Sequence, residues 1–162
     1  MKQNNRNNRN NRNNGGRHNP NNESSVKLIQ VPLSEHYKDK SKLYLPDGIA
    51  HKKAKEFQRQ RIKSHQLRKI LNQSKICRTE LETKNFTEVR NSLFSILPLA
   101  AYNAGRDKSL ECLFNFLKDH LNEKSIKSGK DIILFDELFT SIVAYHKLRE
   151  ENRDVENIQS DF

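Results

Sequence analysis

Apolar residues in this chain are concentrated in its C-terminal half, where they recur every three or four positions. Large aliphatic and aromatic residues are frequent from Phe86 to Leu148, whereas the first 25 residues contain almost none. A spacing of three and four places side chains on one face of an α-helix. Because only 33% of the 162 residues are hydrophobic, the chain can bury a core only where these residues cluster. The sequence therefore predicts one helical domain with polar extensions.

Five segments have the pattern of helices, and we expect a small all-α helical bundle over residues 49–152. The predicted helices run from about Ile49 to Arg61, Ser64 to Leu81, Phe86 to Arg106, Lys108 to Ser125 and Asp131 to Asn152. The third has the widest apolar stripe and is expected to be central. Pro98 lies within it and predicts a kink near Phe94–Pro98, since proline removes one backbone hydrogen bond and clashes with the preceding turn.

The remaining segments lack a helical pattern. Residues 1–25 repeat Asn-Asn-Arg and have no large apolar residue after Met1, so they are expected to form a disordered basic tail. The tail either adds weak affinity for RNA or serves only as a solubilising extension. Residues 26–48 are interpreted as an extended arm or linker, in which Val26–Val31 has the composition of a short strand without an evident partner. Residues 153–162 are expected to be a frayed acidic tail.

Charge divides the chain into a basic and an acidic part. The net charge is +10 overall, +10 within residues 38–78 and −4 within residues 79–162. Such asymmetry favours a polyanionic partner, although an unevenly charged surface is the simpler alternative. Ten cations lie in the segment Lys52–Arg78, where they either neutralise RNA phosphates or form a solvated face.

Motifs for catalysis and cofactor binding are absent from the sequence. There is no phosphate-binding glycine loop, and neither Cys77 and Cys112 nor the six histidines have the spacing of metal ligands. His146 is expected to be a packed core residue, and for Tyr145 a position covering the core is favoured over stacking on a base. We expect no enzymatic activity and no cofactor. Because the chain shows no signal peptide and no apolar run of about 18 residues, we expect a cytoplasmic protein without a membrane span.

Three motifs in order resemble a known family. They are Ser64–Leu71 (SHQLRKIL), Leu99–Arg106 (LAAYNAGR) and Ile142–Lys147 (IVAYHK). Together, over roughly Ile49 to Leu148, they are similar to the small subunit of the type III-A CRISPR–Cas effector, the Csm complex.

This resemblance implies a non-catalytic helical subunit in antiviral defence. Its expected partners are guide RNA and target RNA, other subunits of the Csm complex and further copies of itself. Arg68 and Arg106 fall on the arginine positions of the family and are therefore candidates for RNA contact. Charge and position add Lys63, Lys69 and Lys147. The alternatives are a general RNA-binding helical protein outside CRISPR and an adaptor whose basic face binds acidic proteins.

Overall fold

The computed structural model describes residues 28–160, with side chains described for residues 28–150. This part of the chain is all-α and contains no strand, as the apolar spacing predicts. Its elements are α1 (Leu33–His36), α2 (Ser41–Tyr44), α3 (Ile49–Arg59), α4 (Ser64–Glu80), α5 (Phe86–Phe94), α6 (Ile96–Arg106), the 3₁₀ turn η1 (Lys108–Leu110), α7 (Glu111–His120) and α8 (Gly129–Ser160). The basic tail predicted for residues 1–25 lies outside the described residues.

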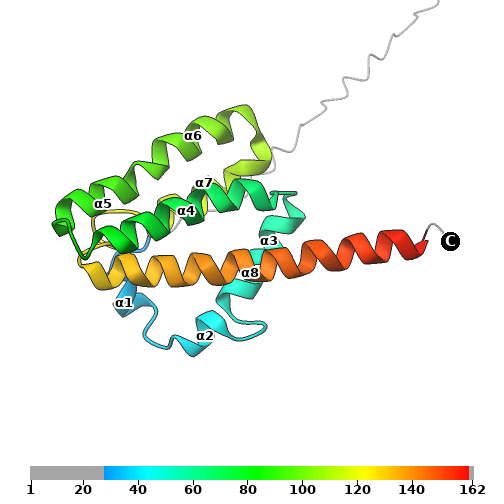
Figure 1. The fold of residues 1–162 in the computed structure, drawn as a ribbon, viewed down its shortest axis with the longest axis horizontal. Helices are drawn as coiled ribbons and strands as arrows, with labels where there is room; N and C mark the ends of the chain where they lie inside the picture. Colours follow the sequence, from blue (N-terminus) through cyan, green and yellow to red (C-terminus); the bar gives the residue numbers. More distant parts are fainter. Residues whose placement is uncertain (1–27, 161–162) are drawn as a thin grey trace, which may run out of the picture.

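Helix α8 is the centre of the bundle, in place of the 86–106 segment that the sequence favoured. It runs along the molecule beside α3 and α4 and also touches α1 and α2 (Figure 1). Phe135, Leu138, Phe139 and Ile142 form one fully buried stripe at helical spacing. The helix continues to Ser160 and so extends beyond Asn152, where the acidic tail was expected to begin.

The third predicted helix is interrupted where a kink was expected, near Phe94–Pro98, and the interruption divides it into α5 and α6. Helix α5 ends at Phe94 and α6 begins at Ile96, on either side of Ser95. Proline has no amide hydrogen to donate to the carbonyl four residues earlier, so regular hydrogen bonding cannot continue through this point. The two helices pack on α4 and α7, and part of their broad apolar stripe stays uncovered: Leu99 is 57% exposed.

The segment before α3 belongs to the bundle, which corrects the interpretation of residues 26–48 as an extended arm or linker. Its described part contains the two short helices α1 and α2, and Leu33 and Leu43 are fully buried. The amide nitrogen of Ile29 donates to the carbonyl of Asp119 over 3.1 Å, and that of Leu33 donates to the carbonyl of Ser125 over 2.9 Å. These backbone contacts fix the segment against the end of α7 without forming a sheet.

Candidate nucleic-acid interface

Helix α4 and the residue that precedes it supply three of the five candidate side chains, because the buried face of this helix is narrow. Leu67, Ile70, Ser74 and Cys77 face the interior at helical spacing, which leaves the rest of the helix surface for charged residues. Lys63 precedes the helix, and its amide nitrogen donates to the side-chain oxygen of Gln66 over 2.8 Å. The exposed side chain of Lys63 is therefore placed at the positive end of the helix dipole.

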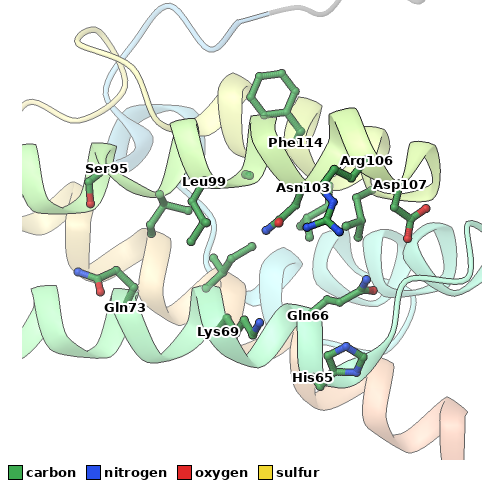
Figure 2. A pocket seen from close by; sticks show the side chains of 15 residues that line it. His65, Gln66, Lys69, Gln73, Ser95, Leu99, Asn103, Arg106, Asp107 and Phe114 are labelled. Carbon is green, nitrogen blue, oxygen red and sulfur yellow. The ribbon is translucent and has the colours of Figure 1, made fainter.

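Lys69 and Arg106, two of the sequence candidates, line one cavity between α4 and α6. The cavity has a volume of about 460 Å³. In Figure 2, Leu99, Asn103 and Arg106 extend from α6 towards α4, which carries Lys69. Residues separated by 37 positions in the sequence thus share one site because α5 and α6 fold back over α4.

The cavity has an apolar interior and a polar rim. Ile70, Leu110 and Leu113 contribute apolar surface, whereas His65 and Gln66 lie with Lys69 and Arg106 among its polar lining residues. The guanidinium carbon of Arg106 lies 5.7 Å from the centroid of the Tyr102 ring, a cation–π arrangement. Tyr102 is 62% exposed, so the arginine and the ring lie together on the surface of α6.

Arg68 and Lys147 lie on the opposite flank of α4, along its seam with α8. The Nζ atom of Lys75 donates to Thr140 Oγ1 over 2.8 Å. Arg68 precedes Lys75 by about two helical turns, and Lys147 follows Thr140 by about two turns of α8. Because α4 and α8 run antiparallel, Arg68 and Lys147 lie at the same level along the contact between these helices. The Nζ atom of Lys147 lies 3.9 Å from the carboxylate of Glu150.

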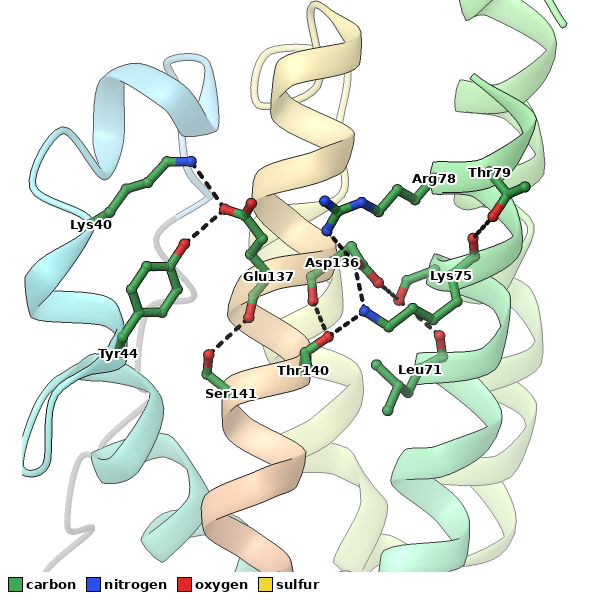
Figure 3. A network of polar contacts seen from close by, with 11 residues as sticks. Lys40, Tyr44, Leu71, Lys75, Arg78, Thr79, Asp136, Glu137, Thr140 and Ser141 are labelled. Carbon is green, nitrogen blue, oxygen red and sulfur yellow. Dashed lines mark hydrogen bonds and ion pairs between the residues drawn. The ribbon is translucent and has the colours of Figure 1, made fainter. Parts of the chain in front are cut away.

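Two other cations of the basic segment are tied to a buried carboxylate. Lys75 and Arg78 lie 2.8 Å and 3.0 Å from Asp136 Oδ2, and Ser74 donates to Oδ1 over 2.9 Å. Figure 3 shows Lys75 and Arg78 converging from α4 on Asp136 of α8. Asp136 is fully buried, so this network joins the two helices. Sequence reasoning missed it because Asp136 is far from α4 in the chain.

Most of the sequence candidates differ from Lys75 and Arg78 in their pairing. Four of the five candidates, Lys63, Arg68, Lys69 and Arg106, have no carboxylate within ion-pair distance among the described residues. Other lysines of the basic segment are paired, including Lys53 with Glu56 and Lys55 with Asp47. Four of the five sequence candidates, at the start of α4 and the end of α6, therefore carry a charge that no ion pair among the described residues neutralises.

The histidine and tyrosine at the end of the third motif are structural, as expected. His146 is 1% exposed, and its Nε2 atom lies 2.8 Å from the carbonyl oxygen of Ile62. Tyr145 packs against the core, donates to the carbonyl oxygen of Tyr44 over 2.5 Å and stacks on the His51 ring. The core interpretation of both residues is confirmed.

Residues 28–160 lack two kinds of feature that would suggest another role. No helix within this range combines the length and apolarity that crossing a membrane requires. Nor does this range contain three or more His, Cys, Asp or Glu side chains arranged to hold a metal ion. The cavity lining combines the cations Lys69 and Arg106 and several apolar side chains with carboxamides, His65, Ser95 and the carboxylate of Asp107.

Comparison with known proteins adds one match. The family model described as Csm2 Type III-A matches residues 40–152, which is more than half of the chain and includes all three motifs. The comparisons with curated proteins and with solved structures gave no match.

Proposed function

The chain belongs to the Csm2 family of type III-A CRISPR effector subunits, and on this premise we propose that it lies along the guide–target RNA and contacts target RNA through the basic face of α4 and α6. Csm2 is a family of structural subunits, so the protein is a component of the Csm complex. The general RNA-binding protein outside CRISPR and the acidic-protein adaptor are less consistent with this membership.

One observation carries the proposal: Lys63, Arg68, Lys69 and Arg106 lack a carboxylate partner among the described residues. An unpaired cation on a surface gains more from a phosphate than a cation that already neutralises a carboxylate. Lys147 also belongs to the proposed face, with Glu150 reducing its net charge.

The positions of the cations favour a backbone path across the exposed side of α4. Arg68 and Lys69 are adjacent residues and point about 100° apart around the helix. Arg106 lies beyond Lys69, across the cavity, and Lys63 lies at the N-terminal end. Contacts of this kind neutralise phosphates and leave the reading of sequence to pairing between guide and target. Copies of the subunit stacked head to tail would extend the same positive surface along the duplex.

The double variant Arg68→Ala/Arg106→Ala, measured in the assembled complex, tests the proposal. We expect weaker binding of target RNA and a salt dependence whose slope falls by roughly 1.5, since each lost phosphate contact removes about 0.7–0.9. The matched control is Lys42→Ala/Lys84→Ala, which removes two cations that already pair with Asp39 and Glu80. If the arginine variant leaves both the affinity and the slope unchanged, the site is wrongly assigned.

Association with a guide-RNA complex is tested separately. The tagged protein is captured from cells that carry a type III-A system, and the RNA that copurifies is sequenced. Repeat-derived guide RNA supports the proposal, whereas RNA without such guides supports an RNA-binding role outside the complex.

A further inference from the structure

The cavity between α4 and α6 has apolar surface that the bundle itself leaves uncovered. Leu99 extends from α6 towards α4 and is nevertheless 57% exposed. Ile70 and Leu113 line the interior near it. Solvent-exposed leucine in a concave site costs free energy that a ligand with an apolar surface recovers on binding.

The rim of the same cavity offers groups that recognise a nucleotide. Lys69 and Arg106 carry positive charge without an ion-pair partner in the described residues, and such cations bind phosphate. The same lining contains one carboxylate, that of Asp107, which forms no ion pair with either cation. Asn103 and Gln66 contribute carboxamides, the side-chain groups that pair with donors and acceptors on base edges.

We propose that this cavity accepts one unstacked nucleotide of the bound RNA, with the base in the apolar interior and a flanking phosphate on Lys69 and Arg106. The inference rests on the proposed contact with RNA and deepens it. A volume of about 460 Å³ falls within the roughly 300–1,000 Å³ of small-ligand cavities and is sufficient for one nucleotide. A base that is paired and stacked inside a duplex exposes only its edges, so the nucleotide has to be unpaired to enter. An apolar side chain of a partner protein would fill the interior but leave both cations unused.

The test compares two RNA duplexes of equal length, one fully paired and one with a single unpaired 2-aminopurine nucleotide. The full-length chain is expected to bind the duplex with the unpaired nucleotide about five- to tenfold more tightly, in line with what insertion of one base contributes. The fluorescence of the 2-aminopurine should also become less accessible to acrylamide quenching when the protein binds.

Leu99→Trp fills the cavity and should abolish both effects. Leu45→Trp is the matched control, because Leu45 is 58% exposed and lies in the loop between α2 and α3, away from the cavity. Asn103→Phe provides a second blocking variant at a half-buried cavity position.

The outcomes separate this inference from the proposed function. Loss of the preference in Leu99→Trp but not in Leu45→Trp supports the nucleotide site. Equal, salt-dependent binding of both duplexes by the unmodified chain overturns the inference and leaves RNA binding intact. A preference that survives both blocking variants also overturns it. Loss of subunit association in Leu99→Trp, with the RNA preference unchanged, would assign the cavity to a protein partner instead. Absence of RNA binding by the unmodified chain overturns the inference, whereas the proposed function is decided by the Arg68→Ala/Arg106→Ala variant in the assembled complex.

Discussion

Lys75 of α4 and Asp136 of α8 form an ion pair of 2.8 Å in which the carboxylate is completely buried and the lysine remains half exposed. Arg78 and Ser74 contact the same carboxylate. The pair joins the two helices that carry most of the proposed RNA-binding residues. It also shows that a cation in a basic segment can stabilise the fold and need not bind a ligand.

Replacing Asp136 should destabilise the bundle. Asp136→Asn removes the charge that Lys75 and Arg78 share, and the free energy of unfolding should fall by about 2–3 kcal/mol because a buried charge-assisted network loses one partner. Urea denaturation followed by circular dichroism measures the change. The control Glu80→Gln breaks a surface pair with Lys84 and should cost less than about 0.5 kcal/mol. Equal effects of the two variants would contradict the structural role of Asp136.

Two glycines should respond oppositely to alanine. A Cβ atom at Gly48 would lie 2.7 Å from the carbonyl oxygen of Leu45 and even closer to that of Lys42, both of them backbone atoms. Gly48→Ala should therefore lower the free energy of unfolding by at least about 1 kcal/mol. Gly105 lies in the last turn of α6, where a Cβ atom meets nothing within 4 Å. Gly105→Ala should raise stability by about 0.5–1 kcal/mol, because alanine loses less backbone entropy in a helix. Thermal unfolding of both variants tests the contrast, and destabilisation by Gly105→Ala would contradict it.

Stability should decline on mild acidification because of His120. Burial lowers the pKa of His120 to about 4. The ring is held neutral, with Nδ1 2.7 Å from the Phe116 carbonyl oxygen and Nε2 2.6 Å from the Tyr37 hydroxyl. The pKa of a histidine is about 6.5 in the unfolded chain, so between about pH 4 and pH 6.5 the unfolded state binds a proton at this residue that the folded state does not. Stability therefore rises with pH through this range. This group alone should reduce the free energy of unfolding by about 2 kcal/mol between pH 7 and pH 5.

Urea unfolding at several pH values measures this dependence. His120→Gln should flatten the curve between pH 6.5 and pH 4.5, whereas His65→Gln, at an exposed position of α4, should leave its slope unchanged. A variant at His120 that keeps the full slope would assign the pH dependence to other groups.

Cys112 should resist alkylation in the folded protein. Burial and its hydrogen bond to Glu56 over 3.0 Å raise the pKa of the Cys112 thiol to about 12, and only the thiolate reacts with iodoacetamide. At pH 8 its labelling, followed by mass spectrometry, should be at least about tenfold slower than in the urea-unfolded chain. Glu56→Gln should speed the reaction of Cys112. Cys77 is fully buried and should stay unreactive in the folded unmodified protein and in the folded Glu56→Gln variant. Rapid labelling of native Cys112 would contradict this arrangement.

Local spacing was sufficient to predict most of the bundle. The helical periodicity from Phe86 to Leu148 and the break at Pro98 depend on neighbours in the chain, and the structure follows them. Leu33 and Leu43 carry no such signal, because each is the one buried residue of a helix of only four residues, too short to show a helical spacing. The two short helices around them form against the bundle and depend on contacts that a local pattern does not contain.

The candidate site was predictable to a smaller extent. The family resemblance selected Arg68 and Arg106, and charge and position added three lysines, but the sequence did not show that Arg68 and Arg106 lie on opposite sides of α4. No sequence pattern predicted the cavity. Leu99 fits the apolar stripe of its segment, and it is exposed only because of the way α6 packs. Whether a cation such as Lys75 is neutralised depends on a carboxylate 61 residues away. These features arise from tertiary packing and could not be read from spacing.

The central position of α8 also determines when the chain can complete its fold during synthesis. The ribosome completes α3 and α4 well before α8, and both helices bury their apolar faces against it. A nascent chain that has not reached Gly129 therefore displays those faces to chaperones and proteases. The bundle closes only when its last helix emerges, so truncated translation products should be recognised and degraded before they can enter an effector complex.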